Sequence, residues 1–197
     1  MTRFSEALIP TLRESPADAE ATSHKLLVRA GMVRQLGAGL WTFLPAGWRV
    51  HSKVERIIRE EMDAIGGQEM LMPVLQPADL WAKTGRLDIQ ELFKIEDRKG
   101  SDLVLAMTHE EAITAHVASE VRSWRDLPKL LYQLQVKERD EPRPRAGILR
   151  TREFVMKDAY SFHLDEASLA AGYQRMYDAY SAIVTRLGLR FRAVQAD

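Results

Sequence analysis

The sequence predicts an α+β fold, in which helices flank a mainly antiparallel sheet. Segments with strand-like alternation gather in the middle of the 197-residue chain, roughly between residues 69 and 156. Segments with helical periodicity lie before, between and after them, a distribution typical of α+β domains. No internal repeat, low-complexity tract or flexible linker separates these segments, so we assign residues 1–197 to one domain.

The first third of the chain predicts two helices around a glycine-rich stretch. Ser15 is an N-cap candidate with Pro16 at the first helical position, and Gly31 ends this helix. Residues 31–47 are rich in glycine and apolar residues and favour short strands and turns. A second helix should cover 48–65, before a pair of glycines, with five apolar residues on one face: Val50, Val54, Ile57, Ile58 and Ile65.

Short strands dominate the middle of the chain. Residues 69–76 read as a strand that is broken or bounded by Pro73, and residues 92–97 and 102–107 are two further candidates. A helix should follow over 108–124.

Two longer alternating segments, 130–141 and 147–156, are separated by Pro-Arg-Pro-Arg-Ala-Gly. They predict a β-hairpin with a long, partly rigid loop. Residues 165–188 predict a last helix that ends at a glycine, with four core residues: Tyr173, Met176, Tyr180 and Ile183. Residues 189–197 begin another strand.

The predicted hairpin carries charged and aromatic side chains on one face. Arg139 and Glu141 lie two residues apart on the first arm, and Arg150, Arg152 and Phe154 alternate on the second. Guanidinium groups bind phosphate oxygens, and an aromatic ring offers a stacking surface for a base, so this set suits a nucleoside triphosphate. Cross-strand ion pairs on a solvated sheet explain the pattern about equally well. The sequence has no Walker loop and no dinucleotide fingerprint.

The composition argues against several classes of protein. A formal net charge of +0 argues against a general nucleic-acid coat protein, although it leaves room for a local basic patch. The absence of cysteine excludes disulfides and thiolate metal sites, and the histidines lack metal-ligand spacing, so we expect no structural zinc. No apolar run reaches the ~18 residues of a membrane span, and the N-terminus has no apolar signal core. We expect a soluble, cytoplasmic protein with no membrane partner.

Seven sequence blocks, in order, resemble one enzyme family. The Arg-Asp-Glu at 139–141 and the Arg-Thr-Arg-Glu-Phe at 150–154 have the form of the second motif of class II aminoacyl-tRNA synthetases. The match narrows to the bacterial prolyl-tRNA synthetases and extends over essentially the whole chain. Its blocks are LPAGWRV, MPVLQPADLW, TGR, THEE, RDEPRPRAGILRTREF, MKDAYSF and FRAVQAD. Arg-x-Glu alone is a weak signal, whereas seven ordered blocks are highly specific.

The resemblance implies an activity and its partners. ATP, accompanied by Mg²⁺, activates L-proline to prolyl-adenylate, and the prolyl group is then transferred to the 3′ end of tRNA(Pro). Residues 131–158 correspond to the second motif. Residues 56–77 resemble the first motif, with Pro73 as its marker, and in the family this helix–strand unit forms a homodimer interface. A plain amphipathic helix followed by a strand explains those residues equally well.

The resemblance assigns ATP contacts to Arg139, Glu141, Arg150, Thr151 and Phe154. Arg139 matches the arginine that contacts the α-phosphate and the amino-acid carboxylate, where a fixed cation stabilises developing negative charge; it is the expected catalytic residue. Glu141 matches the residue beside the adenine amine. Arg150 matches the γ-phosphate ligand, and Phe154 matches the ring stacked on adenine.

The loop of the hairpin is expected to meet the tRNA acceptor end through Arg143 and Arg145. One position departs from the family pattern. The residue before Arg139 is often aromatic, and here it is Glu138. Strand alternation turns Glu138 away from the site.

The resemblance places the proline amine on Thr108 and Glu110, with Arg139 at the carboxylate. A secondary ammonium has two N–H donors, for which a hydroxyl and a carboxylate are suitable acceptors. Thr108 followed by Glu111 also fits a helix capping box, and both interpretations can hold. His109 is expected to be a packed or surface residue rather than a catalyst.

Alternation continues from Phe154 to Met156, Asp158 and Tyr160, which by resemblance line the proline pocket. Met156 and Tyr160 could equally belong to the core. His163 is expected to be an ordinary surface residue.

The third class II motif, the editing insertion and the anticodon-binding domain have no counterpart in the sequence. We therefore expect the chain to be the N-terminal part of a catalytic domain that alone forms prolyl-adenylate poorly or not at all. Two alternatives remain open. One is another class II synthetase, such as the threonyl or seryl type. The other is a synthetase-like protein or fragment that binds ligand or tRNA without catalysis.

Overall fold

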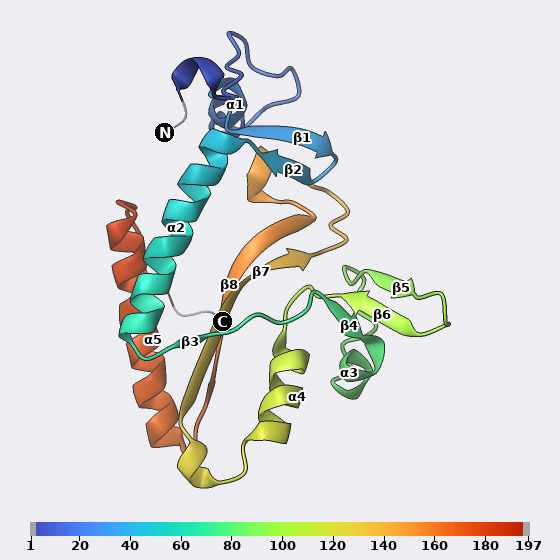
Figure 1. Cartoon of the computed structure of the whole chain (residues 1–197), viewed down its shortest axis with the longest axis vertical. Helices are drawn as coiled ribbons and strands as arrows, with labels where there is room; N and C mark the ends of the chain where they lie inside the picture. The colour runs from blue at the N-terminus through green and yellow to red at the C-terminus, as the bar shows by residue number, and fades with distance from the viewer. Residues whose placement is uncertain (1–2, 195–197) are drawn as a thin grey trace.

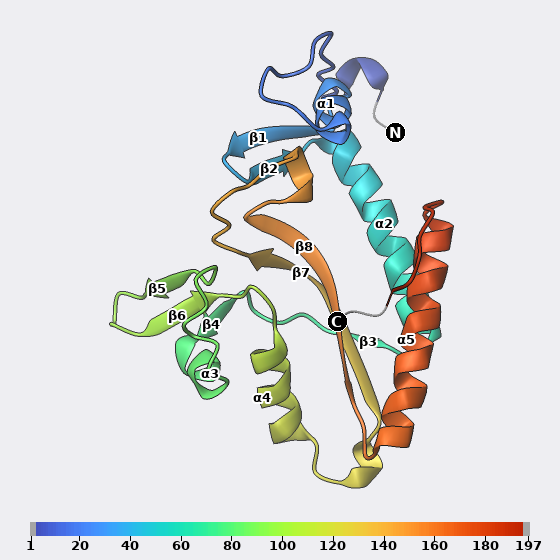
Figure 2. The same ribbon diagram turned by 180° about the vertical axis from the view of Figure 1, so that it is seen from behind.

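A long antiparallel hairpin forms the spine of the computed structural model, which describes residues 3–194 (Figure 1). Strands β7 (Lys129–Glu138) and β8 (Glu153–Phe162) pair along their whole length. Helices α2 (Pro45–Ala64) and α5 (Glu166–Arg186) lie side by side along one face of the hairpin, and α4 (Glu110–Glu120) lies on the other (Figures 1 and 2).

The other elements are short and lie at the two ends of this spine and beside it. In chain order they are a 3-10 helix at Phe4–Glu6, α1 (Thr22–Arg29), β1 (Val33–Gly37), β2 (Leu40–Phe43), β3 (Gln68–Glu69), β4 (Leu75–Pro77), α3 (Ala78–Lys83), β5 (Lys94–Glu96), β6 (Asp102–Leu105), and 3-10 helices at Trp124–Asp126 and Gly147–Leu149.

The strands form three small sheets. Strands β1 and β2 make an antiparallel hairpin, and β4, β6 and β5 make an antiparallel sheet in that order. Strand β3 pairs in parallel with β7, which in turn pairs antiparallel with β8. The predicted α+β class with mainly antiparallel pairing is confirmed, although the strands are divided among three sheets.

Two apolar clusters hold the elements together. Trp81 and Val104 are fully buried between α3 and the β4–β6–β5 sheet. Ile113 of α4 packs with Met72 against the hairpin face that carries Tyr160. Burying each such side chain contributes roughly 1.5–3 kcal/mol, so α4 is fixed on the hairpin by its first turns.

The helix predicted from Ser15 begins later than expected. Helix α1 starts at Thr22 with Ala21 at its N-cap position and no side-chain cap, so the prediction for Ser15 was wrong. The N–H of the buried Ala19 donates to the carbonyl of Pro16, which makes a turn where the first helical turn was expected. Gly31, at φ +67°, follows the end of the helix as predicted.

Helix α2 starts at Pro45, three residues before the predicted start. Proline suits this first helical position because its missing N–H would have had no partner there. Val50, predicted on the apolar face, is 48% exposed. The strand predicted at 69–76 is broken around Pro73: β3 ends at Glu69 and β4 begins at Leu75. A strand broken at this proline was one of the two predicted possibilities.

The return arm of the hairpin was only partly predicted. Ala146 and Gly147 adopt left-handed backbone angles of φ 58° and 66°, so residues 147–149 form a 3-10 helix and the strand begins at Glu153. Helix α5 follows with Asp165 as its N-cap and Gly188 after its end.

Two predicted core residues of α5 lie at the surface of the described chain. Tyr173 is 72% exposed and Tyr180 is 42% exposed, whereas Ile183 is buried as predicted. Residues 189–194 form no strand, and 195–197 of the same prediction lie outside the described residues. Within 3–194, every helix is too short or too polar to cross a membrane.

Gly47 allows α2 to approach the chain before β1. A Cβ atom at this position would lie 2.2 Å from the Met32 carbonyl oxygen, which also accepts the N–H of Leu44. We expect Gly47→Ala to lower the free energy of unfolding by about 1–3 kcal/mol, measured by urea denaturation. Gly37→Ala is the matched control, because its Cβ would meet only the Leu40 side chain at 3.6 Å. Equal losses from both substitutions would contradict the close-approach explanation.

Glu138 and Glu153 face each other across β7 and β8, on the face away from Lys137. Burial, and then the neighbouring Glu153, raise the pKa of Glu138 from 4.5 to about 7. The folded protein thus keeps a proton that the unfolded chain has released. The stabilisation is complete below about pH 4.5 and is lost as the pH rises through 7.

We expect the urea midpoint to fall between pH 5 and 8, and Glu138→Gln to flatten this fall. Glu96→Gln, at an exposed position on β5, should leave the pH profile unchanged. A Glu138→Gln profile that runs parallel to that of the unaltered protein would show that the pair does not share a proton.

Candidate functional site

The predicted site residues meet where the chain leaves β6 and crosses the hairpin to enter α4. The carbonyl of Ala106 accepts the N–H of Glu138, which fixes the crossing beside the end of β7. The next carbonyl, that of Met107, lies 3.5 Å from Nη2 of Arg139. Thr108 and Glu110 therefore lie near Arg139, although about thirty residues separate them along the chain.

One guanidinium group gathers the residues predicted to bind proline's amine. Nη1 of Arg86 donates to Oε2 of Glu110 at 3.1 Å, and Nη2 donates to Oγ1 of Thr108 at 2.9 Å. The same group lies over the ring of Trp81, 4.9 Å from its centroid. Arg86 was not predicted as a site residue. The Thr-Gly-Arg block that contains it was the available signal.

The expected capping box is absent from the start of α4. The N-cap residue is His109, and no side chain caps it. The Glu111 carboxylate is buried and instead accepts from Thr84 at 2.9 Å and from Arg86 at 2.9 Å. Because Thr108 also bonds to Arg86, both expected capping groups are held by tertiary partners.

Glu110 remains an anion in this environment. Burial raises its pKa, but hydrogen bonds from Thr108 and Arg86, together with the charge of Arg86, more than offset burial. The net pKa lies below the ordinary value of 4.5. A half-exposed carboxylate beside a hydroxyl is thus available to accept N–H groups from a ligand.

A buried ion pair lies next to His109, the residue between Thr108 and Glu110. Nζ of Lys137 lies 2.8 Å from Oδ1 of Asp158, and the two side chains are 0% and 9% exposed. The same ammonium lies 2.6 Å from Nδ1 of His109, whose Nε2 lies 3.1 Å from the Pro73 carbonyl. These partners require that Nε2 carries the proton and that Nδ1 accepts from Lys137. Burial, then the charge of Lys137, lower the pKa of His109 to about 4, so the ring stays neutral.

Asp158 is enclosed by donors. The hydroxyl of Tyr160 donates to its Oδ2 at 2.5 Å and Nε2 of Gln133 donates to the same oxygen at 3.0 Å, in addition to the contact with Lys137. The Tyr160 hydroxyl also accepts the backbone N–H of His109. Met156, half-buried, lies two residues before Asp158 on this face. Asp158 and Tyr160 thus support the start of α4, and His109 is packed as predicted.

Arg139 has few partners for its guanidinium group. Its guanidinium lies 5.2 Å from the ring centroid of Phe154, and its buried Nε has no hydrogen-bond partner within residues 3–194. No carboxylate in that part of the chain forms an ion pair with it. An arginine in this state can bind an incoming anion without first losing an ion pair.

The other predicted ATP ligands lie near the hairpin loop. Nε of Arg150 donates to Glu141 at 2.7 Å, and this contact lowers the pKa of the Glu141 carboxyl, helped by the backbone N–H of Arg143. This ion pair joins the two sides of the hairpin loop beyond the ends of β7 and β8, so it resembles the ion pairing of the alternative interpretation but lies outside the sheet. Thr151, in contrast, is buried beside it.

The loop between the arms presents the two predicted tRNA contacts. Arg143 and Arg145 are both exposed. The N–H of Arg145 donates to the carbonyl of Arg150, which narrows the loop at its base.

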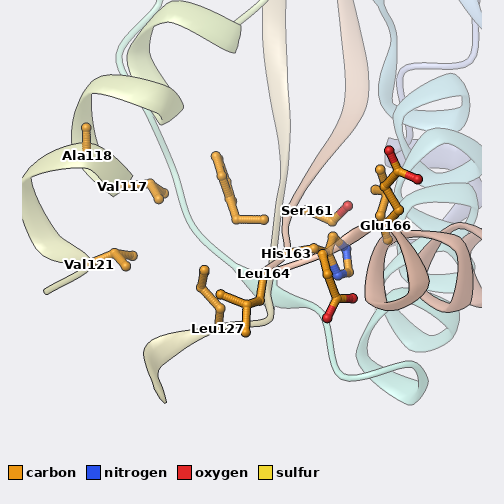
Figure 3. A pocket seen from close by; sticks show the side chains of 11 residues that line it. Val117, Ala118, Val121, Leu127, Ser161, His163, Leu164 and Glu166 are labelled. Carbon is orange, nitrogen blue, oxygen red and sulfur yellow. The ribbon is translucent and has the colours of Figure 1, made fainter. Parts of the chain in front are cut away.

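Two cavities flank α4 at the end of the hairpin where β7 begins and β8 ends. One, of about 630 Å³, is shown in Figure 3, where Val117 of α4 and Val121, the residue after the helix, face Leu127 and Leu164. The other, of about 650 Å³, lies between α4 and the start of β7. Neither contains a residue predicted for the site. We place the site at the N-terminal end of α4 instead, because charged and polar groups converge there.

His163 lies at the first of these cavities rather than on an open surface, so its prediction was wrong. Its Nδ1 lies 2.8 Å from Oγ of Ser168, and its ring packs against Gly172. Among residues 3–194, no three or more His, Asp or Glu side chains are grouped so as to hold a metal ion.

Comparisons with known proteins agree on one family. The model of the tRNA synthetase class II core domain (G, H, P, S and T) matches residues 93–197. A proline--tRNA ligase of Desulfitobacterium hafniense is 57% identical over 197 residues, which are 99% of this chain and 34% of that protein. A proline--tRNA ligase of Nitratidesulfovibrio vulgaris is 58% identical, with the same coverage. The chain spans about a third of the length of the curated relatives it matches.

Two solved structures share the fold. A Giardia lamblia prolyl-tRNA synthetase in complex with prolyl-adenylate has a TM-score of 0.73 and 23% identity, over 79% of this chain and 33% of that one. A Cryptosporidium parvum prolyl-tRNA synthetase complexed with L-proline and AMP has a TM-score of 0.77 and 17% identity, over 90% and 37%.

The buried pair of Lys137 and Asp158 yields a test by double-mutant cycle. Lys137→Met and Asp158→Asn should each cost about 3–5 kcal/mol in urea denaturation, because each leaves the other group without its partner. The double variant should cost less than the sum by at least ~1 kcal/mol. Lys94→Met, at an exposed strand position, is the control and should be nearly neutral. Strict additivity of the two losses would mean that the contact does not couple these residues.

Proposed function

The chain belongs to the family of tRNA synthetase class II core domains (G, H, P, S and T), and we propose that it forms part of a proline--tRNA ligase. The observation that carries the proposal is 54–58% identity, over almost the whole chain, to enzymes of that name. Because the chain spans about a third of those relatives, the complete activity is assigned to the longer protein.

The group formed by Arg86, Thr108 and Glu110 suits the amine of L-proline. Thr108 and the ionised Glu110 offer one hydroxyl and one carboxylate to a secondary ammonium with two N–H donors. Arg86 holds both acceptors in place and is a positioning residue. The floor of this pocket would be the face of β8 that carries Met156, Asp158 and Tyr160.

Arg139 suits the reacting groups. A proline carboxylate oxygen attacks the α-phosphorus of ATP, a new P–O bond forms, and the bond to the departing pyrophosphate breaks. The guanidinium stabilises negative charge on the α-phosphate and orients the carboxylate, and its lack of a carboxylate partner within 3–194 supports this role.

The remaining contacts follow the hairpin. Phe154 would stack on adenine, Glu141 would accept from its amine, and Arg150 would leave Glu141 to bind the γ-phosphate; Thr151 lies beside them. Mg²⁺ would arrive bound to the triphosphate. The hydroxyl of the tRNA 3′ end then attacks the prolyl carbonyl and AMP leaves, with Arg143 and Arg145 at the acceptor end.

We also propose a cytoplasmic homodimer that pairs through the segment 56–77. Leu71 and Leu75, in this segment, are 73% and 48% exposed. A second copy of the chain would cover them.

The test is amino-acid-dependent exchange of pyrophosphate into ATP by the full-length enzyme. L-proline should support exchange, whereas threonine, serine and alanine should not. Glu110→Ala should raise the KM for proline about 10- to 100-fold, because a charged hydrogen bond is lost. Arg139→Ala should lower kcat by about 10²–10³.

Two exposed residues provide controls of the same charge. Glu120→Ala, at the other end of α4, and Arg125→Ala, in the following 3-10 helix, should leave both constants unchanged. Exchange that depends on another amino acid would reassign the specificity. Tight binding of a prolyl-adenylate analogue without any exchange would favour a synthetase-like binding protein.

A further inference from the structure

A polar cavity lies on the N-terminal side of the hairpin loop, separate from the residues assigned to ATP and proline. It has a volume of about 270 Å³ and is built where α1 and the β1–β2 hairpin approach the loop (Figures 1 and 2). Three segments line it: 18–24, 35–41 and 144–147. Of the residues assigned above, only Arg145 lines this cavity.

Close backbone contacts build the walls of this cavity. The N–H of Arg152 donates to the Gly39 carbonyl at 2.9 Å, and a Cβ on Gly39 would lie 2.8 Å from Cγ of Pro144. A Cβ on Gly147 would lie 3.0 Å from Cβ of His24. The three segments therefore touch one another without room for larger residues at the glycines, and the cavity is formed before any ligand arrives.

A buried histidine lines the cavity without a partner. His24 is 7% exposed, and its ring meets that of Trp41 edge-on at 5.1 Å. Its ring nitrogens form no hydrogen bond to another residue within 3–194. His24 therefore offers ring nitrogens at the cavity wall, to which a ligand with a hydrogen-bonding edge could bond.

The other polar groups are mainly acceptors. Asp18 and Glu20 place two carboxylates at the cavity, and Gln35 uses its amide nitrogen on the Gly37 carbonyl, which leaves its oxygen free. Carboxylates repel phosphate but accept hydrogen bonds from the exocyclic amines of bases. The cavity thus favours a planar, amine-bearing base, and the exposed guanidinium of Arg145 at its edge favours a neighbouring phosphate.

We propose that this cavity binds one unpaired, amine-bearing base at the acceptor end of the tRNA. The inference rests on the proposed function, because it assumes that the loop of Arg143 and Arg145 meets tRNA. The base lies between Trp41 and the loop, its amine bonds to Asp18 or Glu20, and His24 bonds to its edge. Arg145 contacts the adjoining phosphate.

The test compares two reactions of the full-length enzyme, one with tRNA and one without. Asp18→Asn/Glu20→Gln should raise the KM for tRNA in prolyl transfer by about 10-fold or more, because each neutral amide is a weaker acceptor than a carboxylate and also presents an NH₂ group to the amine of the base. The KM values for ATP and proline in pyrophosphate exchange should not change. The direction is diagnostic. Removing two negative charges would by itself strengthen RNA binding, so only a specific contact predicts weakening.

Glu6→Gln/Glu14→Gln is the matched control, because it removes the same charge from exposed positions earlier in the N-terminal part of the chain that do not line the cavity. Its KM for tRNA should stay the same or fall. His24→Leu should weaken tRNA in the same way. If that variant fails to fold, the exposed pair Asp18 and Glu20 still decides the question.

Transcripts in which each unpaired acceptor base is replaced by uracil identify the base. For the transcript in which the recognised base is replaced, the unaltered enzyme and Asp18→Asn/Glu20→Gln should have equal KM values for tRNA, because uracil lacks the amine. An unchanged or lowered KM for tRNA in the double variant overturns the proposal, and so does an equal rise in the control. A raised KM for ATP overturns it in favour of a nucleotide site. Absence of proline-dependent exchange by the unaltered enzyme would instead overturn the proposed function itself.

Discussion

The ammonium of Lys137 is the charge on which the site depends. It is fully buried and lies within hydrogen-bonding distance of Asp158 on the neighbouring strand and of His109 at the start of α4. An unpaired ammonium at this depth would be prohibitively costly, so the hairpin register and the position of the helix must both be correct for Lys137 to be accommodated. Lys137 thus links β7, β8 and the start of α4. Thr108 and Glu110 lie on either side of His109, so this link helps to position them.

Two arginines at the site have opposite environments, and the difference separates their roles. Arg86 contacts two carboxylates and a hydroxyl, and it lies over an indole ring. Both of its terminal nitrogens already donate to side chains of the protein, so its main role is to orient Glu110 and Thr108. Arg139 contacts a ring and a distant carbonyl. In a low-dielectric setting, a fixed cation with free donors is the arrangement that stabilises charge developing on a phosphate.

Local patterns predicted most of the helices and strands, whereas the roles of the site residues were assigned by resemblance to the synthetase family. Alternation along the hairpin places Lys137 and Arg139 on one face because the side-chain period of a strand is two. The same reasoning turned Glu138 away, and the register agrees. What could not be predicted depends on partners distant in sequence. Thr108 bonds to Arg86 instead of capping α4. Ala146 adopts a left-handed conformation, and the return strand is shorter than predicted; the pattern of apolar residues does not indicate such a backbone angle.

Two glycines beside the hairpin loop have the same kind of explanation. Gly39 and Gly147 lie more than one hundred residues apart, yet both lie where a side chain would collide with a partner segment, at Pro144 and at His24 respectively. The hairpin loop is therefore supported on the side of α1 and β1–β2 rather than projecting freely into solvent. A loop supported in this way can present Arg145 at a defined position, so an RNA partner would not have to order it on binding. If the loop meets tRNA as proposed, the N-terminal segment contributes to recognition by determining where the loop lies.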